Sequence, residues 1–351
     1  MKSSKIFSFF LVLSCFAVGI RAQDISEVEH GLFSTSPITL TEAAPPQANF
    51  MVRSAVNLSG ELTITAGASD QVTVTFQKRA LTEDRSQAFD YIDLISVDLS
   101  SRPSGAVLEL RAPNPPPWEG ENEAGMVQAE ITVPEGTAVT VEAPYFDVTA
   151  EGKLSSVVIP SSLGRLKITG VEKRTDISTS NRRVILADLT GEINASTTNS
   201  TIVASNITAK VGTARFRNEN GDIRIEGFTG EINVRNSFGR ISITQFVPIG
   251  NGNFIRGNSS PILLEINKID DGQLVVTNRY EDIDFVVPKD VSAFFSLSVG
   301  EDGQIETTNL PVVPDLVQRR RLNLIAGKGA VDISGSISGK GNIFVRGTDI
   351  E

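Results

Sequence analysis

The sequence predicts an all-β protein whose main part is a right-handed parallel β-solenoid. Three five-residue units, Gly221–Ile225, Gly230–Val234 and Gly239–Ile243, each begin with glycine and start nine residues apart. Within each unit apolar and polar residues alternate, which is the pattern of a strand with one buried face. Glycine can form a corner with positive φ without steric cost. Short strands and tight corners at constant spacing are typical of a solenoid.

Composition supports this fold class and excludes some partners. The chain has 351 residues, of which 40% are hydrophobic and 21% charged, so a globular protein is expected. Its 29 glycines and 6% aromatic residues fit many short strands and corners. The formal net charge of −10 would repel phosphate backbones, and nucleic acid is therefore not an expected partner.

The first 22 residues are interpreted as a signal peptide. Lys2 and Lys5 precede an apolar segment, residues 6–20, that is too short for a stable membrane span. The surroundings of Cys15 only faintly resemble a lipoprotein box, so release is favoured over lipid anchoring. We expect a secreted or extracytoplasmic protein, located in the cell envelope or periplasm and not membrane-spanning, whose mature chain has no cysteine.

The chain after the signal peptide divides into three parts. Residues 23–47 are polar and contain three prolines, which predicts a linker or a loose cap. Residues 48–145 contain several alternating segments and predict an antiparallel or irregular β region that caps the solenoid, because an open end would expose unpaired strand edges. Within it, residues 80–89 are the one stretch that could hold a helical turn.

Residues 146–351 are predicted to form a solenoid of about ten coils. Apolar residues that open successive strands recur at 18 to 22 residues, with a last step of 26. They are Val148, Leu166, Val184, Ile202, Ile223, Ile241, Ile262, Ile283, Ile305 and Val331.

A second set of residues recurs with nearly the same period and predicts an asparagine ladder. Its members are Asn181, Asn199, Asn218, Asn236, Asn258 and Asn278. Asparagine tolerates left-handed backbone conformations, and stacked amides could satisfy backbone groups inside a turn. Asn253 lies outside this register and is expected to contribute little.

The residues suited to catalysis are few, and no enzyme, no catalytic residue and no cofactor is expected. The only histidine, His30, falls in the predicted linker, and the only cysteine is in the signal peptide. Imidazole-rich or thiolate metal sites are therefore excluded from the mature chain. Carboxylates remain, and a carbohydrate-active lyase or hydrolase that uses them on the solenoid face is the alternative from another functional class.

The last coils are expected to present an acidic row formed by Asp282, Asp284, Glu306 and Asp332. Adjacent strands lie about 4.8 Å apart, so like charges on neighbouring coils would repel. A bound Ca²⁺ could relieve this repulsion, but a hydrated acidic face is favoured and no metal is expected.

The only tryptophan, Trp118, follows three prolines, Pro115 to Pro117. An exposed indole there could stack on a sugar or on an apolar surface of a partner, which makes Trp118 a candidate ligand-binding residue. The favoured alternative is that Trp118 folds back and plugs the end of the solenoid, since tryptophan is highly buried on average.

The segment Gly221–Val234 resembles the bacterial "putative adhesin" family of secreted β-solenoids, and the resemblance extends over residues 50–350. It implies the solenoid fold and a non-enzymatic role as a surface, envelope or matrix component, adhesin-like or structural. The implied partners are a surface glycan or protein, and self-association is possible. An accessory protein of an envelope-stress system is a further alternative.

Overall fold

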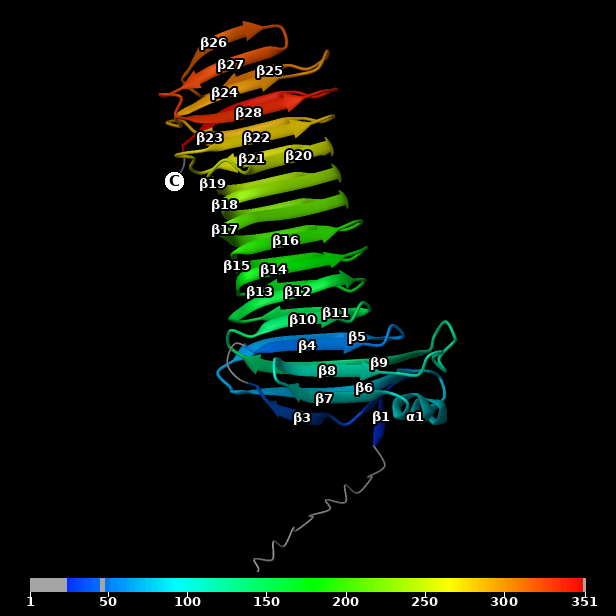
Figure 1. Ribbon diagram of the computed structural model, residues 1–351. Helices are drawn as coiled ribbons and strands as arrows, with labels where there is room; N and C mark the ends of the chain where they lie inside the picture. Colours follow the sequence, from blue (N-terminus) through cyan, green and yellow to red (C-terminus); the bar gives the residue numbers. More distant parts are fainter. Residues whose placement is uncertain (1–23, 45–47, 350–351) are drawn as a thin grey trace, which may run out of the picture.

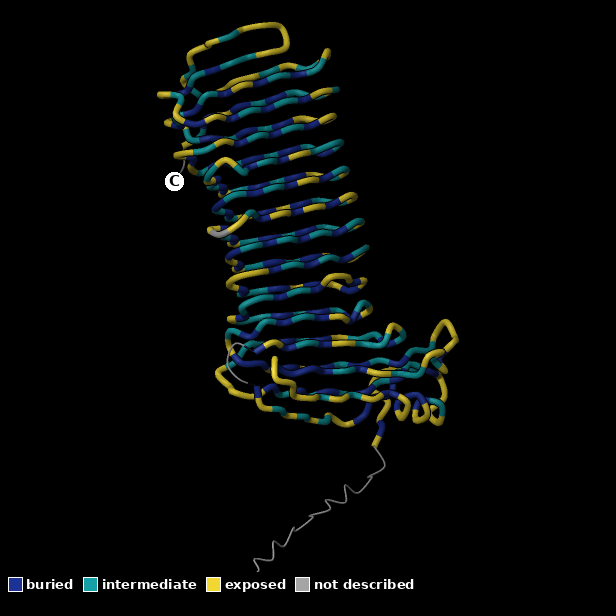
Figure 2. Tube along the Cα trace, in the orientation of Figure 1, coloured by how far each residue is buried: buried dark blue, intermediate teal, exposed yellow. Residues whose placement is uncertain are grey.

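The computed structural model describes residues 24–44 and 48–349, so the predicted signal peptide and Cys15 lie outside the described residues. The described chain is all-β, with one short helix and one continuous sheet of 29 strands. Most strands form an elongated stack of turns (Figure 1). Each turn gives one strand to each of two walls. Buried residues alternate with less buried ones along the strands (Figure 2), and most of the buried side chains are apolar.

The first wall contains twelve strands that pair side by side and parallel. In spatial order they are β9 (Ala124–Pro134), β5 (Leu58–Gly67), β11 (Phe146–Glu151), β13 (Leu166–Thr169), β15 (Val184–Thr190), the first parts of β17 (Ile202–Asn220) and β18 (Ile223–Phe238), β19 (Ile241–Pro248), β21 (Ile262–Ile266), β23 (Ile283–Pro288), β29 (Ile343–Thr348) and β25 (Ile305–Thr308).

The second wall is built in the same way. Its parallel strands are β8 (Gly105–Arg111), β4 (Asn49–Ser54), β10 (Ala138–Glu142), β12 (Leu154–Ser162), β14 (Val171–Thr179), β16 (Glu192–Thr197), the second parts of β17 and β18, β20 (Asn253–Ser259), β22 (Gln273–Asn278), β28 (Val331–Ile337) and β24 (Ala293–Ser298).

Alternation decides which side chains enter the core. Along β22 and β23, every second residue is buried, and the residues between them face outward. The predicted strand openers from Val148 to Ile283 lie in register on the first wall, as their spacing indicates. Each stacks on the equivalent residue of the next turn, so the inner layer is a continuous column of Val, Leu and Ile side chains.

At the C-terminal end the turns are not stacked in sequence order. After β22 and β23, the chain moves outward to form β24 and β25, and then an antiparallel hairpin of β26 (Val312–Gln318) and β27 (Arg321–Ala326). The last two strands, β28 and β29, return and insert between these turns. Val331, which was predicted to open a strand of the first wall, therefore lies on the second wall. Ile343 opens that strand of the first wall instead.

The N-terminal end is ordered in a similar way. The β4–β5 turn lies between the β8–β9 turn and the β10–β11 turn, and all of these pairs are parallel. Parallel stacking therefore begins at Asn49, well before the predicted boundary at residue 146. Among the described strands, every antiparallel pair includes at least one strand outside these turns, as in β6 with β9 and β7 with β8.

An antiparallel layer covers the outermost N-terminal turn. It consists of β1 (Ile25–Glu29), β2 (Leu32–Thr35), β3 (Ile38–Ala43), β6 (Gln71–Leu81), the helix α1 (Arg85–Asp93) and β7 (Ser96–Arg102). Of the two alternatives for residues 23–47, only the linker is wrong for the described part, because β1 to β3 pair within this layer. The alternation of Ile38 and Leu40 with Thr39 and Thr41 is a strand pattern that could have predicted β3. The prolines of the segment, Pro37 among them, favoured a linker instead.

The six asparagines predicted to form one ladder belong to different rows. Asn218, Asn236 and Asn278 are buried at a corner, and each donates from Nδ2 to a carbonyl of the preceding turn, namely Ser200 O (2.6 Å), Gly221 O (2.8 Å) and Ser260 O (2.8 Å). Thr179 has the same role two turns earlier, donating to Ser162 O at 3.1 Å. These bonds satisfy backbone acceptors inside the turn.

The remaining asparagines lie elsewhere. Asn181 and Asn199 form an exposed row with Asn220, in which each amide donates to the preceding one, at 2.7 Å and 2.8 Å. Asn258 is half-buried beside the ladder rather than in it. The expectation that Asn253 contributes little is wrong, because it is 1% exposed and donates to Gly250 O (2.9 Å) and accepts from Ile232 N (3.2 Å).

Substitution of two adjacent residues in β18 tests the orientation of the second wall. Val234 is fully buried, and Val234→Asp would place an unpaired charge between the walls, so we expect a loss of more than about 3 kcal/mol in the free energy of unfolding. Arg235→Asp is the control, because that side chain is exposed. Denaturant titrations that show equal losses would contradict the assignment.

The buried corner row is tested by Asn236→Ala. Loss of its bonds to Gly221 O and Gly239 O leaves buried carbonyls unsatisfied, which should cost about 1–3 kcal/mol of stability. Asn258→Ala is the matched control. Thermal melts in which both variants behave alike would show that the asparagines act only as turn formers.

Candidate binding face

The outward side chains of the first wall form a long face, here called the first-wall face. Its side chains lie in straight rows, because the strands stack in register. From the N-terminal end, the middle row is Thr63, Thr149, Lys167, Ile185, Val203, Arg224, Ser242, Leu263, Asp284, Phe344 and Glu306.

A shallow groove of about 460 Å³ crosses the C-terminal half of this face. Its lining includes Arg240, Leu263, Asp282, Asp284, Phe344, Arg346 and Glu306. The structure thus brings together three of the four predicted acidic residues. Phe344 and Arg346 join them from a segment about sixty residues further along the chain, because β29 inserts beside β23.

The carboxylates of the groove do not form the continuous row that was expected. Phe344 stands in register between Asp284 and Glu306, so these two carboxylates are separated by an aromatic ring. Asp332 is not on this face at all, since β28 belongs to the second wall and pairs Asp332 with Gln273 and Phe294. The prediction for Asp332 is wrong because the β26–β27 hairpin interrupts the period.

Two of the groove's carboxylates have partners within the chain. Asp284 is paired with Arg346, whose Nε donates to Asp284 Oδ1 at 3.0 Å. Asp282 Oδ1 accepts the backbone N–H of Asn342 at 2.7 Å. In the part of the chain that the structure describes, no three His, Cys, Asp or Glu side chains are grouped to hold a metal ion. The groove instead offers acceptors, guanidinium donors and one aromatic ring to a ligand.

The N-terminal half of the face has a second hollow, of about 370 Å³, with a more basic lining. Arg165, Lys167 and Arg183 lie there on two neighbouring strands, together with half-buried Ile185. Arg165 contacts Asp147 of the preceding turn, with Nε 2.8 Å from Oδ2. Cationic groups therefore predominate at this end of the face and acidic groups at the other, although Glu61 and Asp147 line this hollow and Arg240 and Arg346 line the groove.

A repeated aspartate contact joins neighbouring turns along this face. Asp147 Oδ1 accepts the backbone N–H of Arg165 at 2.7 Å, and Asp222 Oδ1 accepts that of Arg240 at 2.9 Å. The sequence analysis missed these aspartates. The signal that could have found them is an Asp followed eighteen residues later by an Arg, which occurs at both places.

Two groups stabilise the ionised carboxylate of Asp222. A hydrogen bond from Arg224, 2.6 Å from Nη2 to Oδ2, is the main cause that lowers the pKa of Asp222, and the N–H of Arg240 adds to it. Its side chain is about a quarter exposed, at 28%.

Trp118 is not a surface residue. It is 8% exposed, its Nε1 donates to Asn57 O at 3.0 Å, and its ring lies edge-on to Tyr91 with centroids 5.6 Å apart. The ring also covers Gly125, where any Cβ would come within 2.5 Å of it. Trp118 therefore packs the loop that contains it against α1 and β9, and it cannot stack on a ligand in this arrangement.

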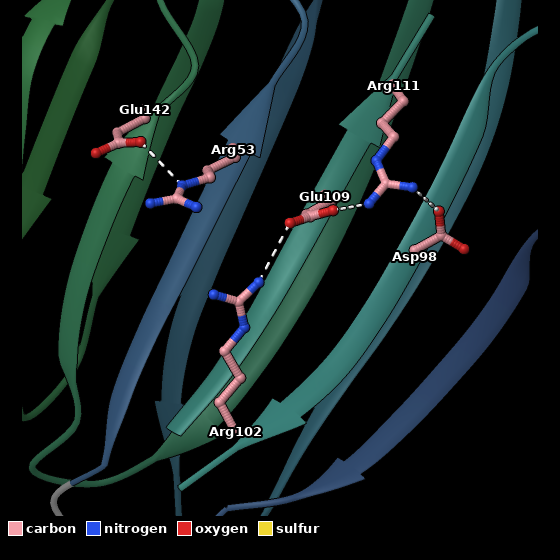
Figure 3. Close-up of polar contacts among 6 residues, drawn as sticks. All are labelled: Arg53, Asp98, Arg102, Glu109, Arg111 and Glu142. Carbon is pink, nitrogen blue, oxygen red and sulfur yellow. Dashed lines mark hydrogen bonds and ion pairs between the residues drawn. The ribbon is translucent and has the colours of Figure 1, made fainter. Parts of the chain in front are cut away.

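Two groups of ion pairs lie on the second wall near the N-terminal end, one across β10 and β4 and one across β8 and β7 (Figure 3). Glu142 pairs with Arg53 at 3.1 Å, and Glu109 contacts both Arg102, at 3.4 Å, and Arg111. Arg111 also reaches Asp98 of the antiparallel β7 at 3.6 Å. The six residues are largely satisfied by one another, which favours a role in joining the strands over one in binding a ligand.

A larger hollow of about 640 Å³ lies at the corner between β21, β23 and the C-terminal end of β29. Four of its charged side chains pair within the chain, Lys268 with Asp270 and Lys289 with Asp349, both at 2.6 Å. None of the described residues that line it is aromatic. The smaller groove on the first-wall face is the better candidate for a binding site.

The comparisons with known proteins identify solved structures and nothing else. No family model matches the chain, and no match was found among curated proteins. A putative cell adhesion protein from Clostridium sporogenes ATCC 15579 is 12% identical, with a TM-score of 0.20, over 89% of this chain and all (100%) of that one. A putative adhesin from Bacteroides fragilis NCTC 9343 is 11% identical, with a TM-score of 0.28, over 88% and 97%.

A third structure, a putative lipid binding protein from Parabacteroides distasonis ATCC 8503, is 11% identical, with a TM-score of 0.29, over 88% of this chain and 96% of that one. Solved bacterial proteins described as adhesins are thus among those similar to the chain, in agreement with the family that its sequence resembles. At these identities and TM-scores they carry no further argument.

The contact between Asp222, Arg224 and Arg240 predicts a pH dependence. Because the pKa of Asp222 is lowered on folding, its contribution to stability is present above the unfolded value of about 3.9 and is lost as the pH falls through the folded value. Asp222→Asn should therefore melt below the wild type at pH 7, and the two melting temperatures should converge below about pH 4. A difference that persists unchanged to pH 2 would contradict this.

Proposed function

We propose that the protein is an extracytoplasmic, non-enzymatic binding protein whose first-wall face attaches, in the manner of an adhesin, to a surface glycan or protein. Export by the signal peptide of residues 1–22, without lipid anchoring at Cys15, belongs to this proposal. So do right-handed winding of the coils and protection of both ends of the stack by the antiparallel strands. Among the described residues, no helix has the length and apolarity needed to cross a membrane.

The observation that carries the proposal is the half-buried ring of Phe344, the one aromatic side chain in the middle row of the first-wall face. Phe344 has Asp284 on one side and Glu306 on the other, and Arg240 lies further along the same groove. An aromatic ring gives a ligand an apolar surface for stacking, while carboxylates and guanidinium groups fix its orientation. Sugars and the side chains of a protein surface both have this mixed character.

The same geometry supports a binding role over a hydrolase or lyase. Hydrolysis of a glycosidic bond usually needs two carboxyl groups on either side of one bond, one of them acting as a proton donor. Here Asp284 is paired with Arg346, Asp282 is bonded to a backbone N–H, and Phe344 separates Asp284 from Glu306.

Binding to immobilised glycans and surface proteins tests the proposal. Purified residues 23–351 should bind at least one member of such a panel, and Phe344→Ser should weaken that binding at least tenfold, because the stacking surface is lost. Phe254→Ser is the matched control, since Phe254 is an outward, half-buried phenylalanine on the second wall.

Two results would count against the proposal. Equal loss of binding in both phenylalanine variants would separate binding from the groove. Sustained release of reducing ends or unsaturated sugars from a bound polysaccharide, abolished by Glu306→Gln, would assign the face to an enzyme.

A further inference from the structure

The rows of the first-wall face have a charge order that fits a second copy of the same face. Counted in strands, β13 lies three turns to the N-terminal side of β18, and β23 lies three turns to the C-terminal side. The first of these strands presents Arg165 and Lys167, and the second presents Asp282 and Asp284. Equal distances from β18 mean that a rotation about β18 exchanges the two sets.

We propose that the partner of the first-wall face is a second copy of this chain, packed face to face and antiparallel, with a two-fold axis parallel to the strands over Asp222 and Arg224. The inference rests on the proposed function, because it names the partner of the same face. Such a contact is isologous, so each pair of residues occurs twice.

The rotation brings opposite charges together at three positions off the axis. Three turns from it, Arg165 meets Asp282 and Lys167 meets Asp284 of the other copy. One turn further out, Glu151 meets Arg346, and Thr149 meets Phe344. Two turns from the axis, half-buried Ile185 meets half-buried Leu263. Charge complementarity of this kind selects partner and register.

On the axis itself, each copy contributes one Asp222–Arg224 ion pair. Two such pairs, related by the two-fold axis, can exchange partners so that each arginine lies between two carboxylates. The rotation also places Asp222, Arg224 and Glu226 each opposite its own copy, so the direct contacts along β18 join like charges. Exchange of partners offsets this for Asp222 and Arg224 but not for Glu226, which disfavours the contact at that one position.

The charge pattern also excludes the neighbouring register on the N-terminal side. Moving the axis half a turn in that direction would pair Asp147 with Asp282 and Arg183 with Arg240. Both are like-charge contacts, which disfavour that arrangement.

The face has the size that a specific dimer needs. From β5 to β25 it spans about ten strand spacings of about 4.8 Å, or roughly 48 Å. Five residues along each strand give a width of roughly 16 Å at about 3.3 Å per residue. The product, roughly 800 Å² per copy, equals the area that each partner buries in a standard-size interface.

Sedimentation velocity of residues 23–351 and its charge variants tests the inference. The wild type should sediment as a dimer, and Lys167→Glu and Asp284→Lys should each weaken the dimer at least tenfold, because two attractive pairs become repulsive. Two outcomes should restore it. One is the double variant Lys167→Glu/Asp284→Lys, and the other is an equimolar mixture of the two single variants, in which every contact again joins opposite charges. Arg235→Glu, on the second wall, should dimerise as the wild type does.

Thermal melts of each variant show whether it is folded, and restoration in the mixture cannot arise from misfolded chains. The inference of a second copy as partner is overturned if the wild type is monomeric in a concentrated stock as well as after 100-fold dilution. It is also overturned if the mixture of the two single variants is monomeric. Binding of a monomer to a glycan or protein, lost in Phe344→Ser, would leave the proposed function standing while this inference fails. A dimer that forms through another face, unaffected by Lys167→Glu, also overturns it.

Discussion

In-register stacking of parallel turns is the constraint on which the rest of this structure depends. Each buried residue lies on the equivalent residue of the next turn, and each outward residue lies in a straight row. A single turn cannot bury enough apolar surface to offset the entropy of ordering it, so neighbouring turns must supply the remaining stability. The buried corner residues, such as Asn236 and Asn278, serve the same stacking by satisfying carbonyls of the preceding turn.

The regular part of the fold could be predicted because its signal is periodic. The openers from Val148 to Ile283 follow the period of the turns, and their pairing in the structure confirms the predicted register. The two ends could not be predicted, because a period says how strands are spaced in the chain and not in which order turns are stacked. Insertion of β28 and β29 is a long-range event to which no local residue pattern corresponds.

The same distinction applies to the candidate site. Asp282, Asp284 and Glu306 could be placed on one face by counting, whereas Phe344 and Arg346 reach it only through the inserted turn. Asp332 was misplaced for the same reason. Trp118 shows another limit of prediction from sequence. A single tryptophan after prolines has the same sequence pattern whether its ring faces solvent or, as here, packs on Gly125. The side chains that meet on the face of a stack therefore depend on which turns are neighbours in space.

The most direct measurement of this claim uses pairs of cysteines in residues 23–351, which otherwise have none. Adjacent parallel strands bring facing Cα atoms to about 4.8 Å, within the range of a disulfide, whereas strands two apart are too distant. The order of turns described here predicts that Asp284→Cys with Phe344→Cys forms an intramolecular disulfide on oxidation, detected by peptide mass spectrometry, and that Asp284→Cys with Glu306→Cys does not. Ready formation of the 284–306 disulfide, with none between 284 and 344, would show that the turns stack in sequence order and would contradict the account.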